Sequence, residues 1–190
     1  MIAGLLLAAG GARRFGSQKL VALLGGEPLV RRAAQVLAAT TDRVTVVVGN
    51  EAAVVQSALN GLAVHFVENS NWSSGLASSL VCGIQSLPAD AEAVVIALGD
   101  QPHIDPTVVR AVVARWRAGG CAVVATRYDG VQGHPVLFSR ELFGDLLALT
   151  GDSGAKRIIE QQLERTAYVD VPAPAPVDVD TVGDLEGLGE

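Results

Sequence analysis

The sequence predicts an α/β fold in which helices cover both faces of a mostly parallel central sheet. Short apolar runs typical of buried strands alternate with stretches of helical periodicity along the 190 residues. Residues 44–48 are continuously apolar apart from Thr45, as in strands covered on both faces. The chain is long enough for one well-buried core and too short for two comfortable domains. We therefore expect a single domain of three α/β/α layers spanning residues 1–190.

Each expected element follows from local pattern. The expected strands lie at residues 2–9, 44–48, 64–67, 93–98, 121–126 and 167–171. The expected helices lie at 27–39, 51–59, 76–87, 105–118, 140–149 and 154–163, with a short terminal helix that follows the acidic segment 178–185. Pro28 in a first turn and Asp105 as an N-cap favour two of these helix starts. Residues 20–26 and 129–133 are predicted to be loops, and the proline-rich residues 172–176 an extended connector.

The first strand is followed by a loop that is rich in glycine and in positive charge. Between residues 10 and 19 it carries three glycines and three cations, Arg13, Arg14 and Lys19, and no acid. Such a loop suits phosphates, because glycines let backbone N–H groups approach an anion. An ordinary strand-to-helix turn with solvated cations explains the composition equally well. The loop does not match the Walker motif, because Lys19 lies two positions beyond the place where that motif has its lysine. It does not match the dinucleotide-binding fingerprint either, because its glycines are spaced differently.

Composition excludes several classes of partner. A net charge of −6 argues against nucleic acid or an anionic membrane as a general partner. No apolar run reaches the ~18 residues of a membrane span, and Met1 leads directly into a strand, so we expect a cytoplasmic protein. Cys82 and Cys121 lack metal-ligand spacing and are expected to be reduced, buried thiols.

Four further residues stand where either a structural or a functional role fits. Asp100 directly follows an apolar strand, at the sheet edge where α/β folds bind ligands, although Gly-Asp-x-Pro is also a good turn sequence. Trp72 lies in a polar turn and could contact a ligand or clamp the loop. His134 beside a proline and Lys156 in a glycine-containing turn could each be simply structural or solvated.

The pattern Leu-Ala-Ala-Gly-x-x-x-Arg-x-Gly-x-x-Lys, residues 7–19, resembles the signature loop of nucleotidyltransferases that attach an NMP to a phosphorylated acceptor. Later segments resemble, in the same order, those of the MobA-like NTP transferase family and its molybdenum cofactor cytidylyltransferase branch. These segments are residues 69–79, 98–102, 133–135, 151–156 and 178–185. The resemblance implies a Rossmann-like nucleotidyltransferase fold.

The resemblance also implies roles for individual residues. Arg14, Lys19 and Asp100 would be catalytic, and Asp100 with Asp180 would hold Mg²⁺. The implied nucleotide-binding residues are Leu7, Ala8, Ala9, Gly10, Gly11, Arg14, Lys19, Asn69 and Gly75. The implied acceptor-binding residues are Trp72, Ser79, His134 and Lys156. Two departures from the family pattern, Ala12 and Gly183, leave the implied charged residues in place.

The implied reaction is transfer of CMP from CTP to the terminal phosphate of Mo-molybdopterin, with release of pyrophosphate. Ala9 favours CTP, because the guanylyltransferases usually carry glycine at this position. A molybdenum hydroxylase or its maturation chaperone would be the protein partner. The alternatives are a molybdopterin guanylyltransferase, a sugar- or polyol-phosphate cytidylyltransferase, and a non-catalytic carrier of nucleotide or molybdenum cofactor.

Overall fold

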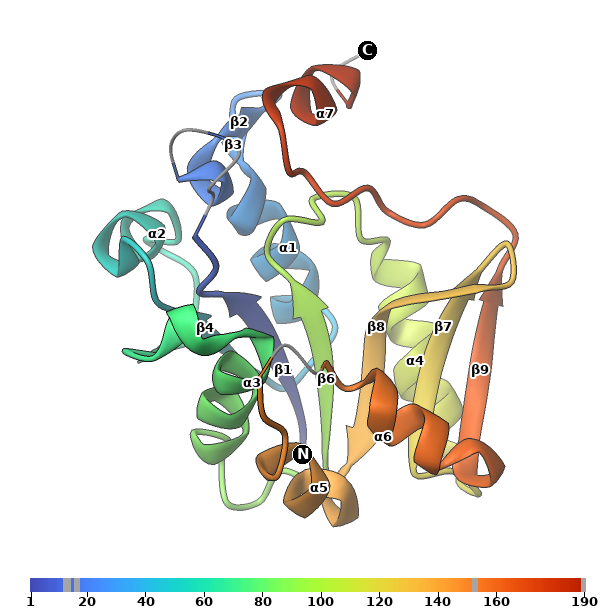
Figure 1. Ribbon diagram of the computed structural model, residues 1–190. Helices are drawn as coiled ribbons and strands as arrows, with labels where there is room; N and C mark the ends of the chain where they lie inside the picture. Colours follow the sequence, from blue (N-terminus) through green and yellow to red (C-terminus); the bar gives the residue numbers. More distant parts are fainter. Residues whose placement is uncertain (12–14, 16–17, 152–153, 189–190) are drawn as a thin grey trace.

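The computed structural model describes residues 1–11, 15, 18–151 and 154–188, and within them one large sheet forms the centre (Figure 1). Its strands run in the order β5-β4-β1-β6-β8-β7-β9. Only β8 is antiparallel to its neighbours, β6 and β7. The strands are β1 (Ile2–Ala8), β4 (Arg43–Val48), β5 (Val64–Glu68), β6 (Ala93–Leu98), β7 (Val123–Tyr128), β8 (Val131–Ser139) and β9 (Thr166–Val171). The mostly parallel sheet predicted from the sequence is confirmed.

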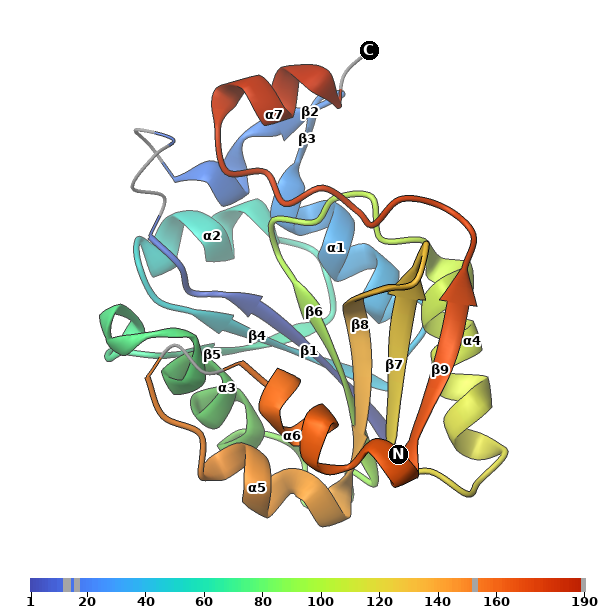
Figure 2. The same cartoon turned by 45° about the vertical axis from the view of Figure 1, so that its right-hand side comes forward.

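Helices cover both faces of the sheet, which confirms the three layers. The helices are α1 (Leu29–Ala38), α2 (Ala52–Ala58), α3 (Leu76–Gln85), α4 (Pro106–Arg117), α5 (Phe143–Leu147), α6 (Lys156–Gln161) and α7 (Val182–Gly187). Figure 2 shows α1, α2 and α4 behind the sheet and α3, α5 and α6 in front of it. In the described part of the chain, no helix combines the length and apolar character needed to cross a membrane.

Strand β1 lies at the centre of both apolar layers. Its residues are all buried. Because side chains alternate along a strand, Leu5 and Leu7 pack in one apolar cluster while Leu6 and Ala8 pack in the other. The parallel neighbours β4 and β6 pair with β1 on its two sides. The end of β1, with the residues 9–11 that follow it, therefore lies at the middle of the sheet's carboxyl edge.

The start of the first helix was predicted two residues too early. Glu27 and Pro28 form strand β3, which pairs antiparallel with β2 (Leu23–Leu24). Pro28 has an extended backbone, with φ −57° and ψ 140°, and α1 begins at the next residue. Gly25 and Gly26 both have positive φ and form the turn of this hairpin. The predicted loop over residues 20–26 therefore contains a short 3-10 helix, Lys19–Val21, and half of a hairpin.

The loop predicted over residues 129–133 is also wrong. Strands β7 and β8 form a hairpin, and the residues between them, Asp129 and Gly130, both have positive φ. Asp-Gly is a strong signal for such a two-residue turn, so the sequence carried the information. The last two large helices are shorter than predicted, because each is flanked by a single 3-10 turn.

A strap, residues 172–181, runs from the end of β9 across the carboxyl edge of the sheet to α7 (Figures 1 and 2). Val179 in this strap is fully buried and packs in a small apolar cluster with Leu24 and Leu29. The following helix α7 is fixed by a capping box between Thr181 and Asp184. The strap therefore brings its acidic residues over the ends of the central strands.

Candidate active site

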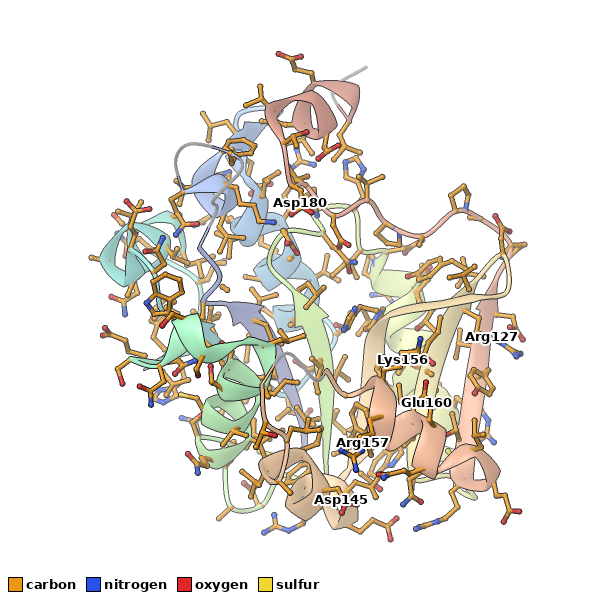
Figure 3. The ribbon with its side chains drawn as sticks, in the orientation of Figure 1. Arg127, Asp145, Lys156, Arg157, Glu160 and Asp180 are labelled. Atoms are coloured by element: carbon orange, nitrogen blue, oxygen red, sulfur yellow. The ribbon has the colours of Figure 1, made fainter. Side chains whose placement is uncertain are left out.

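Lys19 lies between two carboxylates at the carboxyl edge of the sheet. Its Nζ donates to Asp100 Oδ2 at 2.8 Å and to Asp180 Oδ1 at 2.7 Å. Lys19 follows the loop after β1, Asp100 follows the neighbouring strand β6, and Asp180 comes from the strap. Figure 3 shows Asp180 on the strap, close to the sheet edge. Residues far apart in the sequence thus meet where parallel sheets usually bind ligands.

The Lys19 ammonium keeps its positive charge in this position. Burial acts to lower the pKa of Lys19, but hydrogen bonds to Asp100 and Asp180 and their negative charges outweigh burial, and the pKa is raised. The Lys19 side chain is only 12% exposed, whereas that of Asp180 is 52% exposed. Two carboxylates that converge on one cation form a set of hard oxygen donors, of the kind that a magnesium ion uses.

A third carboxylate stands beside this pair. Asp178 Oδ1 accepts a hydrogen bond of 2.7 Å from Gln101 Nε2. Burial raises the pKa of Asp178, and the negative charges of Asp100 and Asp180 act in the same direction, against the hydrogen bond from Gln101. The family resemblance from which the role of Asp180 was predicted implied no role for Asp178 or Gln101. The two-residue spacing of Asp178 and Asp180 was the signal that could have drawn attention to Asp178.

The first cleft, about 350 Å³ in volume, opens beside Lys19 and Asp100. One wall is the end of β1 and the loop after it, and the opposite wall is the segment before and within α3. Its lining residues are Leu7, Ala8, Ala9, Gly10, Gly11, Lys19, Leu20, Trp72, Ser73, Gly75, Leu76, Ser79, Leu98 and Asp100. The nucleotide-binding residues predicted from residue 7 to residue 11, with Lys19 and Gly75, are therefore brought together.

Trp72 both lines this cleft and clamps its wall. A Cβ atom at Gly11 would lie 2.9 Å from the Trp72 ring, and one at Gly49 would lie 2.7 Å from Trp72 Cβ. Only glycine at these two positions leaves space for the tryptophan. The two alternatives that the sequence left open for Trp72 are thus compatible, because the residue packs on the loop with part of its surface and faces the first cleft.

Asn69 supports the same wall from behind. It is buried, and its Nδ2 donates to the hydroxyls of Ser78 and Ser79 while its Oδ1 accepts from the Asn71 backbone. It is not among the residues that line the first cleft. A direct contact between Asn69 and a nucleotide stays a prediction, and its contacts within the protein assign it to holding the segment before α3.

The second cleft, about 220 Å³, adjoins the first and shares Leu7, Leu76 and Leu98 with it. Its remaining lining residues are Leu80, Ile96, Gln132, Gly133, His134, Val136, Phe138, Gly154, Ala155, Lys156 and Ile159. Burial lowers the pKa of His134, although the charge of Asp100 acts to raise it. Burial of His134 therefore favours its neutral form.

The four predicted acceptor-binding residues fall into two groups. His134 and Lys156 line the second cleft, whereas Trp72 and Ser79 line the first. Figure 3 shows Lys156 at the start of α6, in front of the sheet. Arg14, predicted to be catalytic and nucleotide-binding, lies outside the described residues.

Comparison with known proteins agrees with this geometry. Residues 4–166 match the family described as the MobA-like NTP transferase domain. The chain belongs to this family. The resemblance drawn from the sequence is thereby confirmed, and the family supports nucleotidyltransferase activity. All residues of the first cleft lie within the matched range, whereas Asp178 and Asp180 follow it.

Two curated relatives of this MobA-like domain carry different names. The chain is 29% identical to nicotine blue oxidoreductase of Paenarthrobacter nicotinovorans, over 98% of this chain and 96% of that protein. It is 30% identical to the bifunctional protein GlmU of Coxiella burnetii, over 84% of this chain and 34% of that protein. The second likeness therefore concerns about a third of a longer protein.

Solved structures show the same fold over the whole chain. Rv0371c from Mycobacterium tuberculosis superposes with a TM-score of 0.88 and 28% identity, covering 99% of this chain and 97% of that one. Its homologue from Mycobacterium sp. strain JC1 gives 0.86 and 31%, covering 98% and 94%. A complex of Rv0371c with manganese gives 0.81 and 29%, covering 98% and 97%.

Proposed function

We propose that this nucleotidyltransferase is a Mg²⁺-dependent enzyme that transfers CMP from CTP to the terminal phosphate of Mo-molybdopterin and releases pyrophosphate. The observation that carries the proposal is the meeting of Lys19, Asp100 and Asp180 at the mouth of a cleft formed by the signature loop. A lysine and two carboxylates at this position provide charges of both signs for a metal–triphosphate complex.

The donor set fits magnesium. Carboxylate oxygens of Asp100 and Asp180 point to the same place. Lys19 Nζ lies there, 2.8 Å from Asp100 Oδ2 and 2.7 Å from Asp180 Oδ1. Among the described residues no group of three His, Cys, Asp or Glu side chains forms a metal site, so substrate oxygens would complete the coordination. Magnesium is commonly held by one or two carboxylates together with substrate phosphates. When bound, it would offset the negative charge of the triphosphate and of the departing pyrophosphate. The manganese complex of Rv0371c supports a divalent ion in a relative of this fold.

The residues of the chain would position the two anionic reactants. Lys19 and Arg14 would hold the triphosphate, and the backbone of residues 7–10 would hydrogen-bond the base. The acceptor phosphate oxygen forms a bond to the α-phosphorus as the bond to pyrophosphate breaks. A phosphate monoester is already nucleophilic at neutral pH, so no general base is required. Catalysis then consists of alignment and charge neutralisation.

The lining of the second cleft supports a ring-bearing acceptor. Its walls are largely apolar side chains, with Phe138 and Ile159 among them, and its charged side chain is Lys156. A sugar or polyol phosphate would give up many hydrogen bonds to water on entering such a cleft. A ring system can pack a face against these apolar side chains while polar groups at its edge keep contact with water, and Lys156 can meet its phosphate. This contrast favours the pterin over a polyol acceptor.

The oxidoreductase relative supports a second candidate function. Its similarity extends over nearly the whole of both chains, so the same pair of clefts could serve an oxidoreductase reaction on nicotine blue. Such a reaction needs an electron donor or acceptor and releases no pyrophosphate. A GTP-dependent enzyme, another phosphate acceptor, or a carrier without turnover are the remaining alternatives. Delivery of the product to a molybdenum hydroxylase or its chaperone stays a prediction.

The test is Mg²⁺-dependent release of pyrophosphate, with CTP or GTP, with and without Mo-molybdopterin, for the wild type and Asp100→Ala. Release that requires both CTP and the pterin and is lost in Asp100→Ala is the expected result. Release with GTP and the pterin but not with CTP would assign the protein to the guanylyltransferases. No release with any pair, together with oxidation of NADH or NADPH in the presence of nicotine blue, would favour the oxidoreductase.

A further inference from the structure

Gln101 is a buried polar residue to which the proposed reaction gives no role. It directly follows Asp100, and only 6% of it is exposed. Its Nε2 donates to Asp178 Oδ1 at 2.7 Å, while its Oε1 has no hydrogen-bond partner among the described residues. Burying an amide with part of its hydrogen-bonding capacity unused costs free energy. The bond to Asp178 is the feature that explains a glutamine here.

Within the described part of the chain, this bond and a backbone bond beside it join the strap to the turn after β6. The backbone N–H of Val179 donates to the Asp100 carbonyl at 3.1 Å, next to the Gln101–Asp178 bond. The side chain of Val179 is fully buried on the other side of the strap, in the cluster with Leu24 and Leu29. Asp178 and Val179 of the strap are thus hydrogen-bonded to the turn after β6, immediately before Asp180.

The chain after Asp180 is held separately. Asp184 Oδ2 accepts from the backbone N–H groups of Asp180 and Thr181, at 3.0 and 2.7 Å. These bonds fix the backbone of Asp180 relative to α7 and do not relate it to Asp100. The half-exposed Asp180 side chain accepts from Lys19 Nζ, which also binds Asp100. A metal that takes the place of this ammonium would find the two carboxylates at a spacing to which the contacts between the strap and the turn after β6 contribute.

We propose that Gln101 is a positioning residue, which holds Asp178 and thereby sets the spacing of the Asp100 and Asp180 carboxylates for a divalent metal. This inference rests on the proposed function, because it requires those two carboxylates to bind the metal. Groups that orient metal ligands typically change metal affinity by about 10- to 100-fold when they are removed. Gln101 acts in this way through the strap, without touching the metal.

The test is calorimetric titration of CTP into the full-length protein, once with Mn²⁺ and once with EDTA. The ratio of the two affinities is the gain that the metal provides. We expect Gln101→Leu to reduce this gain by about tenfold or more, while the affinity measured in EDTA and the melting temperature stay near the wild-type values. Asp178→Ala removes the same hydrogen bond from the side of the strap and should reduce the gain equally.

Two further variants separate positioning from other effects. Asp178→Asn keeps an oxygen that accepts from Gln101 Nε2 but removes the charge, so it should retain the gain. Gln35→Leu is the matched control, because Gln35 Nε2 makes a similar 2.8 Å bond to Glu27 Oε1 in another part of the protein. It should leave the gain unchanged.

Each outcome decides a different point. If the wild type shows no gain from Mn²⁺, the proposed metal site itself fails, and this inference fails with it. If the wild type shows the gain and both Gln101→Leu and Asp178→Ala keep it, the positioning role is wrong and the proposed function stands. If Asp178→Asn loses the gain as fully as Asp178→Ala, Asp178 acts through its charge, and Gln101 is not the residue that sets the spacing.

Discussion

Lys19 and a metal ion would compete for the same two carboxylates. Its ammonium group lies within 2.8 Å of an oxygen of Asp100 and of Asp180, and like charges cannot share that point. On binding a metal–nucleotide complex, the ammonium would exchange its carboxylate partners for phosphate oxygens. Lys19, which we propose to neutralise the triphosphate, would thus also keep the two proposed metal ligands paired with a positive charge before the complex binds.

The first prediction concerns Mn²⁺ binding without nucleotide. Lys19→Met removes the competing charge, so we expect Mn²⁺ to bind about tenfold more tightly than to the wild type, as measured by electron paramagnetic resonance of the free ion. The same variant should lose at least about 100-fold in nucleotidyl transfer. Lys156→Met, at the other lysine of the chain, is the control for Mn²⁺ affinity. Equal or weaker binding by Lys19→Met would argue against competition.

The second prediction concerns acid stability and His134. Burial lowers the pKa of His134, so the unfolded chain binds a proton more readily than the folded one. The stability attributable to this residue is full above the ordinary histidine pKa of 6.5 and falls as the pH drops below it. We expect His134→Gln to show a smaller fall in melting temperature between pH 7.5 and pH 5.5 than the wild type. The exposed His103→Gln serves as the control, and an identical fall in all three proteins would contradict the prediction.

At the scale of single elements, the first cleft depends on close packing between the ends of two strands and the 3-10 helix Trp72–Ser74. Gly49 follows β4, and a Cβ atom there would lie 2.7 Å from Trp72 Cβ and 2.9 Å from the carbonyl oxygen of Ala9. A methyl group at this point has to displace the tryptophan or the backbone after β1. Both belong to the wall of the first cleft.

The third prediction is that Gly49→Ala destabilises the protein by about 1–3 kcal/mol in urea unfolding and also weakens CTP binding. Gly144→Ala is the matched control, since Gly144 lies in helix α5 and a Cβ there meets nothing within 4 Å. That change should be neutral or stabilise by up to about 1 kcal/mol. Unchanged stability of Gly49→Ala would mean that the wall adjusts easily.

At the scale of the whole molecule, the fold places two clefts side by side, with Leu7, Leu76 and Leu98 between them. The first is formed by the loop after β1 and the start of α3, and the second by β8 and the start of α6. A reaction between two bound molecules needs such an arrangement, because the reacting atoms must meet at the shared boundary.

The fourth prediction tests whether the second cleft binds the acceptor and the first binds CTP. Lys156→Ala should raise the KM for the acceptor by about tenfold, through loss of a charged contact to its phosphate, and leave the KM for CTP unchanged. Arg157→Ala is the control, because Arg157 is also an exposed cation of α6 but lines a separate hollow with Asp145 (Figure 3). Equal effects of the two variants on the acceptor KM would assign Lys156 only a general electrostatic role.

The sequence alone determined the layers of the fold and the edge of the sheet at which we propose catalysis. Alternating apolar runs and amphipathic stretches are local patterns, and a parallel sheet follows from them by general rules of chain connection. The signature loop and Asp100 each follow a buried strand, so their place at the carboxyl edge was predictable. The local pattern was misleading where two signals compete, as at Pro28, which suits a helix start and ends up in a hairpin strand.

Only the tertiary structure decided which distant residues meet. It separated Trp72 and Ser79 from His134 and Lys156, and it brought Asp178 to Gln101, which no local pattern relates. The physical reason is that the strap has no regular secondary structure between β9 and α7. Its path is fixed by the burial of Val179 and by hydrogen bonds to the turn after β6, and such long-range contacts exist only once the sheet has assembled.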